Sequence, residues 1–124
     1  MMELLHARLR ADDPVLLVDD EFLVLWMLED TLGDIGLRNI HTAASTSSAR
    51  ALLASHTFAF GFLDINLGHE KSFALAETLM EKAIPFAFVS GYGRAGLEGR
   101  FGSVPVLSKP VDGKALRSVV SIES

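Results

Sequence analysis

Short apolar runs alternate with longer segments of helical periodicity along most of this chain, and that alternation limits the possible folds more than any other feature. The runs are rich in β-branched and aromatic residues, and we expect strands at 15–18, 39–43, 58–63, 85–89 and 104–107. Apolar residues at intervals of three and four predict helices at 22–32, 49–53, 73–80 and 116–120. Strands buried on both faces and separated by helices form a parallel sheet covered on both sides. The sequence therefore predicts an α/β fold with a doubly wound, five-stranded parallel sheet.

The segment 91–103 is the weakest helical candidate because it contains five glycines. Each glycine inside a helix costs about 1 kcal/mol relative to alanine. We therefore expect the fourth helix of the fold to be short, mobile or partly melted. Residues 1–14 form an N-terminal extension in this interpretation, with a short extra helix or disorder as the alternatives for 1–13. Residues 15–124 form the single domain.

Composition excludes several classes of protein. The chain has no cysteine, which excludes disulfides, thiolate zinc sites and cysteine nucleophiles, and which fits a cytoplasmic protein. A net charge of -5 without any basic run argues against nucleic-acid binding. No apolar stretch reaches the roughly 20 residues that a membrane helix needs, so we expect no membrane partner. The N-terminal residues mix charges with single leucines, unlike a signal peptide.

Polar side chains follow four of the five predicted strands at the point where each strand ends. Asp19 and Asp20 follow the first strand and Asp64 follows the third, while Ser90 ends the fourth and Lys109 follows the fifth. Functional groups of an open parallel sheet gather at the carboxyl ends of its strands. We therefore expect these carboxylates, the hydroxyl and the ammonium to converge in one crevice.

This set of groups suits the transfer of a phosphoryl group to a carboxylate. Clustered carboxylates raise one another's pKa unless a cation lies among them, and Mg²⁺ prefers oxygen ligands, typically one or two carboxylates together with phosphate. A carboxylate can attack a phosphoryl group as a nucleophile, and catalysis is then mainly positioning and charge neutralisation. Magnesium, Lys109 and the Ser90 hydroxyl would each bind one equatorial oxygen. The product would be an aspartyl phosphate.

Four segments, LLVDDE, FLDINL, FVSGYG and PVLSKP, resemble the signature segments of response-regulator receiver domains and come in the same order. The resemblance covers the chain from Val15 to its end and implies a flavodoxin-like (βα)5 receiver fold. It implies a phosphoacceptor of two-component or phosphorelay signalling that catalyses its own phosphorylation and dephosphorylation and is not a turnover enzyme. The implied partners are a sensor histidine kinase or a histidine phosphotransfer protein. Output would pass to a downstream target through protein–protein contacts, because no effector segment follows the receiver.

The same resemblance implies a role for each matching residue. Asp64 would be the phosphoacceptor. Asp19 and Asp20 would be the acidic pair that binds Mg²⁺, with Asp20 the closer ligand, and Asp64 and the backbone carbonyl of Asn66 would complete the protein ligands. Lys109 would bind the phosphoryl group, and the bond to the proline that follows it would be cis.

The segment 85–93, PFAFVSGYG, is similar to the FAT-GUY receivers of alphaproteobacteria, which often stand alone in stress-response phosphorelays. It departs from their pattern in Val89 and Ser90, where alanine and threonine are usual, and in the glycine after the tyrosine. Ser90 would be the switch hydroxyl. Val106 occupies the position where ordinary receivers carry an aromatic residue. The usual coupling between an aromatic ring at that position and the switch hydroxyl therefore has no ring in this sequence. Tyr92 is then the candidate for an aromatic switch.

Alternatives remain at the level of the sequence. The acids at 19–21 also suit the start of a helix, and Tyr92 also suits a packed or half-exposed ring. A pseudo-receiver that binds partners without phosphorylation would share this fold, although it would normally lack one acid or the lysine. A haloacid-dehalogenase-type phosphatase would need a second aspartate two residues after Asp64, where Asn66 stands. A flavodoxin would need a phosphate-binding loop in place of the acids.

Overall fold

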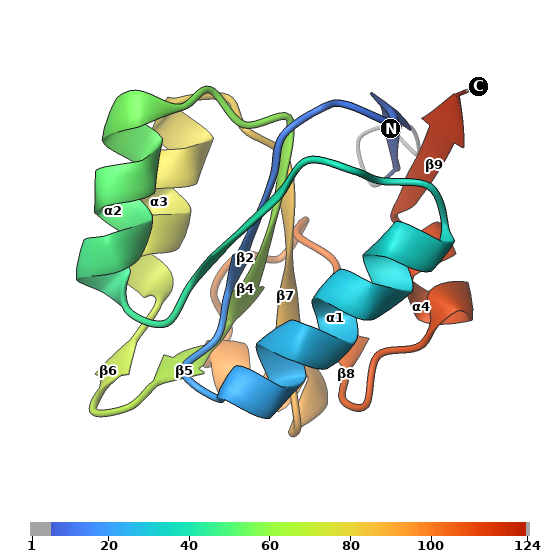
Figure 1. The fold of residues 1–124 in the computed structure, drawn as a ribbon. Helices are drawn as coiled ribbons and strands as arrows, with labels where there is room; N and C mark the ends of the chain where they lie inside the picture. The colour runs from blue at the N-terminus through green and yellow to red at the C-terminus, as the bar shows by residue number, and fades with distance from the viewer. Residues whose placement is uncertain (1–5, 124) are drawn as a thin grey trace.

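The computed structural model describes residues 6–123, and a five-stranded parallel sheet lies at the centre of the domain (Figure 1). The strand order is β3-β2-β4-β7-β8. The bounds are Val15–Val18 for β2, Ile40–Ala43 for β3, Phe60–Asp64 for β4, Phe86–Ser90 for β7 and Val106–Ser108 for β8. From β2 the chain first adds β3 on one side of the sheet and then adds β4, β7 and β8 on the other. The carboxyl ends of β2 and β4 therefore flank the crevice of a doubly wound sheet. The predicted fold class is confirmed.

Helices cover both faces of this sheet (Figure 1). One face carries α1 (Phe22–Asp34) and α4 (Gly113–Arg117), and the other carries α2 (Thr46–Ser55) and α3 (Phe73–Glu81). Alternate residues of β2 serve the two layers: Val15 and Leu17 pack in the cluster that contains Leu28 of α1, whereas Leu16 packs in the cluster that contains Leu79 of α3. The continuous apolar runs in the sequence therefore reflect strands that are buried on both sides.

The fourth helical position holds only a five-residue 3-10 helix, η2 (Gly93–Leu97). The prediction of a short fourth helix is confirmed, and its mobility stays a prediction. The chain leaves η2 through Glu98 and Phe101, both with left-handed backbone angles. The Phe101 ring returns to the core and lies edge-on to Phe88, with 5.3 Å between the ring centroids. That contact anchors the glycine-rich segment to the sheet.

Residues near both ends of the chain form a second, two-stranded parallel sheet, which corrects two predictions. β1 (Ala7–Arg10) pairs with β9 (Val120–Glu123), and the Ala7 amide donates to the Val119 carbonyl at 2.7 Å. Residues 7–10 are therefore neither helical nor disordered, whereas the same prediction for residues 1–5 lies outside the described residues. The last helix ends at Arg117, before the predicted 120, because Val120 pairs with Ala7 in this second sheet.

A small antiparallel hairpin follows β4, and the sequence interpretation had no element there. β5 (Asn66–Leu67) pairs with β6 (Glu70–Lys71) across a two-residue turn. Gly68 opens this turn with φ +65, an angle that glycine adopts without strain and that two-residue hairpins require. No helix within residues 6–123 has the length and apolar character to cross a membrane.

Candidate functional site

Three carboxylates meet at the carboxyl edge of the sheet. Asp19 and Asp20 follow β2, and Asp64 ends β4; one oxygen of each lies within 4.8 Å of the others. The parallel register pairs Val18 with Leu63, which brings the residues after each to the same level of the sheet. Asp19 and Asp64 are buried, with 1% and 7% of their surface exposed, and Asp20 is exposed to solvent. The group is therefore open on one side only.

Lys109 lies among these carboxylates. Its Nζ is 2.9 Å from Asp19 Oδ2 and 3.4 Å from Asp64 Oδ2, and it also lies 3.4 Å from Glu21 Oε1. The Lys109 amide donates to the Ser90 carbonyl at 2.9 Å, which extends the pairing of β7 with β8 by one residue. The peptide bond to Pro110 is cis, as the resemblance implied.

Backbone amides orient the two buried carboxylates. Asp19 Oδ1 accepts a hydrogen bond from the Glu21 amide at 2.9 Å, and Asp64 Oδ1 accepts one from the Asn66 amide at 3.3 Å. The remaining oxygen, Oδ2, of each carboxylate then faces the Lys109 ammonium. In the loops after β2 and β4, each carboxylate is thus oriented by a hydrogen bond from the backbone amide two residues later in the chain.

Burial and charge perturb this cluster strongly. Burial, together with the charge of Asp19, raises the pKa of Asp64 from 3.8 to about 6, although Lys109 and the Asn66 amide act in the opposite direction. For Lys109, burial alone would lower the pKa, but the hydrogen bond and charge of Asp19 and the charge of Asp64 raise it above its usual value of 10.5. Lys109 is therefore charged at neutral pH, and Asp64 has its pKa at about 6, not far below neutral pH.

The donor set fits a hard divalent cation. Asp19 Oδ2 is buried, and the Lys109 ammonium at 2.9 Å is its charged partner among the described residues. Asp20 is exposed and Asn66 is half-buried, so carboxylate and carbonyl oxygens lie on the side that water can reach. Mg²⁺ takes oxygen ligands and usually keeps several waters, which this half-open group of carboxylates would permit.

Ser90 lies at the same edge of the sheet, at the end of β7. It is 2% exposed, and its Oγ accepts a hydrogen bond from the Tyr92 amide at 2.9 Å. Its neighbour Val89 pairs with Asp64 across β4 and β7. The Tyr92 ring, by contrast, is 79% exposed and lies outside the core in this state. The hydroxyl is thus held in place by the backbone of the residue that was the candidate aromatic switch.

The β5–β6 hairpin contributes a residue that the sequence interpretation missed. A Cβ on Gly68 would lie 3.8 Å from Asp20 Oδ2, so the turn of the hairpin approaches the acidic pair closely. Lys71 of β6 then lies 3.7 Å from Glu98, just after η2. The signal for this hairpin was the glycine at the first position of a two-residue turn.

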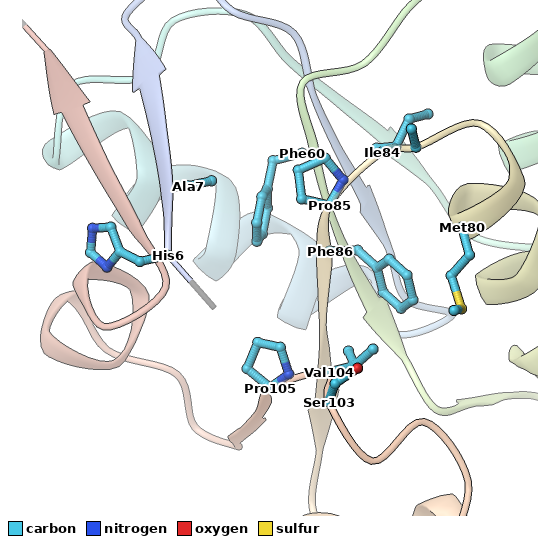
Figure 2. Close-up of a pocket in the computed structure, with 11 residues that line it drawn as sticks. His6, Ala7, Phe60, Met80, Ile84, Pro85, Phe86, Ser103, Val104 and Pro105 are labelled. Carbon is cyan, nitrogen blue, oxygen red and sulfur yellow. The ribbon is translucent and has the colours of Figure 1, made fainter. Parts of the chain in front are cut away.

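A separate cavity of about 440 Å³ lies at the opposite, amino end of the strands (Figure 2). Apolar side chains line most of it, among them Phe60, Phe86 and Val104, and His6 is the titratable residue among the described residues of its lining. None of its described lining residues carries a carboxylate, and it is separated from Asp19 and Asp64 by the length of the sheet. The chemistry of the carboxyl edge therefore does not involve this cavity.

Comparisons with known proteins agree with this arrangement. The family model of the response regulator receiver domain matches residues 15–121. The solution structure of SdrG from Sphingomonas melonis Fr1 has a TM-score of 0.72 and 35% identity, covering 89% of this chain and 98% of that chain. The BeF3-activated conformation of SdrG from Pseudomonas melonis Fr1 has a TM-score of 0.73 and 35% identity, covering 85% and 93%.

A more distant structure shares the fold alone. The receiver domain of the PhyR response regulator from Erythrobacter litoralis has a TM-score of 0.76 and 24% identity, covering 87% of this chain and 86% of that chain. A search of curated protein sequences gives no match. The family match spans all five strands of the central sheet and every polar residue described above at its edge. The chain therefore belongs to the response regulator receiver domains, the signalling modules of two-component systems.

Proposed function

We propose that Asp64 accepts a phosphoryl group from a phosphohistidine on a sensor histidine kinase or a histidine phosphotransfer protein, in a reaction that depends on Mg²⁺. The observation that carries this proposal is the convergence of Asp19, Asp20 and Lys109 on Asp64. A buried carboxylate faced by one fixed ammonium and two further carboxylates suits a site that receives a cation and a phosphoryl group together.

In this proposal each residue of the site has a separate role in the phosphoryl transfer. A carboxylate oxygen of Asp64 forms a bond to phosphorus while the phosphorus–nitrogen bond of the donor imidazole breaks; that electron pair stays on the nitrogen, which takes up a proton. Mg²⁺ held by Asp19, Asp20, Asp64 and the Asn66 carbonyl would neutralise charge on the phosphoryl oxygens. Lys109 moves its hydrogen bond from Asp64 to a phosphoryl oxygen. The Ser90 hydroxyl donates to another.

An apolar surface beside the site suits the docking of the phosphodonor. Four large side chains are exposed on α1, namely Phe22, Leu23, Trp26 and Met27. One of them, Met27, also lines an apolar hollow of about 230 Å³ together with the Lys109–Val111 segment, whereas Phe22 and Trp26 lie on the side of α1 that faces Thr42 and Ala43. We propose that the phosphodonor docks on this exposed apolar surface of α1, which adjoins the Lys109–Val111 segment of the site. Trp26→Ser should slow transfer from a phosphorylated histidine phosphotransfer protein and leave phosphorylation by acetyl phosphate unchanged.

The test of the main proposal uses acetyl phosphate and Mg²⁺, with intact mass as the readout. The unsubstituted chain should gain one phosphoryl group, and Asp64→Asn should gain none. Asp30→Asn is the matched control, because Asp30 is an exposed aspartate of α1 away from the carboxylate group. An adduct of equal yield in Asp64→Asn would assign the phosphoryl group to another residue. The absence of any adduct in the unsubstituted chain would favour the alternative function, a pseudo-receiver that binds partners without phosphorylation.

The finer assignment to the FAT-GUY receivers is part of this proposal. It is supported by the segment 85–93, PFAFVSGYG. The output would then be a change in protein–protein contacts on the surface that includes segment 91–103.

A further inference from the structure

The guanidinium of Arg94 holds the two ends of the glycine-rich segment together. Its Nη1 donates to the Val104 carbonyl at 2.8 Å, and its Nη2 donates to the carbonyls of Phe101 at 3.0 Å and Gly102 at 3.2 Å. None of the ion pairs among residues 6–123 involves Arg94. These three carbonyls are therefore the hydrogen-bond partners of a planar group whose fixed fork of donors suits several acceptors at once.

At one end, this cluster is connected to Ser90. Tyr92 donates its amide to Ser90 Oγ at 2.9 Å, and Arg94 follows Tyr92 by two residues. Gly93, between them, has φ +61, so the backbone makes a sharp turn from the hydroxyl to the arginine. A displacement of the Tyr92 amide thus moves the start of η2 and the Arg94 side chain with it.

At the other end, the same cluster is connected to β8. Val104 directly precedes Pro105, whose carbonyl accepts the Phe88 amide at 2.9 Å where β8 joins the sheet. Val106 follows and packs on the core, and it has no aromatic ring that could contact Ser90. The backbone of Ser90 is joined to β8 directly by the β7–β8 ladder, whereas the Ser90 hydroxyl is connected to residues 101–104 through Tyr92 and the guanidinium of Arg94.

We propose that Arg94 is the positioning residue that couples the Ser90 hydroxyl to residues 101–106, in place of the aromatic side chain that Val106 replaces. The inference rests on the proposed function and specifies how that site is regulated. When Ser90 turns toward a phosphoryl group on Asp64, its oxygen withdraws from the Tyr92 amide. Arg94 then shifts its hydrogen bonds with the carbonyls of 101, 102 and 104, and the exposed surface of this segment changes.

The chain offers a matched pair of variants for the test. Arg94→Met keeps the aliphatic length of the side chain and removes all three donated hydrogen bonds. Arg100→Met is the control: its guanidinium contacts the Glu77 carboxylate at 2.9 Å and lies over the rings of Phe73 and Phe101, but it donates no hydrogen bond to the carbonyls of 101, 102 and 104 that Arg94 binds. Arg94→Lys, which keeps the charge without the planar fork, replaces Arg94→Met if the latter does not fold.

The readout is the change in backbone amide NMR shifts when Mg²⁺ and beryllofluoride are added, with beryllofluoride standing in for the phosphoryl group. Amides of Ser90 and Tyr92 should respond in every variant. Amides of Phe101, Val104 and Val106 should respond in the unsubstituted chain and in Arg100→Met, and should lose their response in Arg94→Met. Hydrogen exchange of 101–104 in unliganded Arg94→Met should be faster by about tenfold or more, because all three hydrogen bonds donated by Arg94 are lost.

Two outcomes would overturn the inference. One is a full response at residues 101–106 in Arg94→Met. The other is an equal loss of that response in Arg100→Met, which would show general loosening of the segment rather than coupling through Arg94. Failure of the proposed function looks different, because the unsubstituted chain would then show no response to beryllofluoride at Ser90 or Tyr92 at all, and the inference would fail with it.

Discussion

The ammonium of Lys109 lies 2.9 Å from Asp19 Oδ2, closer than the 3.4 Å that separates it from Asp64 Oδ2. Lys109 therefore does not pair with Asp64 alone in the resting domain. Asp19 holds the ammonium at the floor of the site, where it still reaches Asp64. The arrangement leaves part of the charge of Asp64 uncompensated, in line with the raised pKa of that carboxyl.

Substitution of this lysine should destabilise the metal-free domain and abolish phosphorylation. Lys109→Met removes the cation that compensates two buried carboxylates, and we expect a loss of about 2 kcal/mol in the free energy of unfolding at neutral pH in EDTA. Mg²⁺ should restore most of this loss because it supplies positive charge to the same oxygens. Urea unfolding with and without Mg²⁺ measures both effects.

Lys114→Met is the control for this experiment, because Lys114 is exposed and forms no ion pair among the described residues. Lys109→Met should affect phosphorylation more than metal affinity. A loss of magnesium affinity as large as that in Asp20→Asn would contradict the role of Lys109 as the phosphate-binding residue.

The stability of the metal-free domain should depend on pH through Asp64. Burial first, and then Asp19, raise the pKa of Asp64 in the folded state from 3.8 to about 6. Between pH 3.8 and about 6 the folded domain thus binds more protons than the unfolded chain. The contribution of Asp64 to the free energy of unfolding therefore falls as pH rises through this range. The effect is at most about 3 kcal/mol, since each pKa unit corresponds to about 1.4 kcal/mol.

Asp64→Asn removes this titration and should be more stable than the unsubstituted chain above about pH 6 in EDTA. Urea unfolding of both proteins between about pH 4 and 8 gives the difference, in which the titration of carboxylates remote from Asp64 cancels. Identical pH profiles for the two proteins would mean that Asp64 is ionised normally in the fold.

Magnesium affinity should depend on Asp20 and not on Glu21. Asp20 belongs to the group of carboxylates, whereas Glu21 precedes α1 and turns its carboxylate toward Lys109 at 3.4 Å. Asp20→Asn should weaken magnesium binding by about tenfold or more, and Glu21→Gln should change it little. Trp26, which is 59% exposed on α1, provides a fluorescence signal for the titration. A larger loss in Glu21→Gln would place the acidic pair one residue further along the chain.

The central sheet, and the residues that meet at its carboxyl edge, could be predicted from the sequence by two simple rules. Continuous apolar runs indicated strands buried on both faces, and the carboxyl ends of parallel strands necessarily meet, so the approach of Asp19, Asp64 and Lys109 followed from their positions alone. The direction of each carboxylate oxygen did not follow, because it depends on the amides of Glu21 and Asn66.

The elements that were missed depend on contacts that no local pattern encodes. β1 contains two arginines in four residues, and only its pairing with β9 at the far end of the chain makes it a strand. Val119 and Val120 continue the spacing of Leu116 as a helix would, yet Val120 and Ile122 also alternate as in a strand, and the pairing with Ala7 and Leu9 decides between the two. Each strand of the β5–β6 hairpin is only two residues long, too short for a periodic signal.

The final prediction concerns the glycine-rich segment 91–103, which should exchange its amide hydrogens fastest in the unliganded domain. A single 3-10 turn, with Gly93 and Gly99 at positive φ, provides few backbone hydrogen bonds. Phosphorylation of Asp64 should slow this exchange, because Ser90 then gains a fixed partner and biases the segment toward one state. Hydrogen exchange with Mg²⁺ and beryllofluoride measures the change. Equal exchange in both states would rule out an order–disorder switch and leave the fold assignment intact.

Gly96 offers a sharper version of this test, because a Cβ there would lie 3.1 Å from Ile65 Cδ1 and 3.6 Å from Ser90 Oγ. Gly96→Ala should push η2 away from Ser90, lower the free energy of unfolding by about 1 kcal/mol and weaken the protection gained with beryllofluoride. Gly102→Ala is the matched control, since a Cβ there meets nothing within 4 Å and the residue has no positive φ. If both variants gain the same protection as the unsubstituted chain, then close packing of η2 on Ser90 is not what orders the segment.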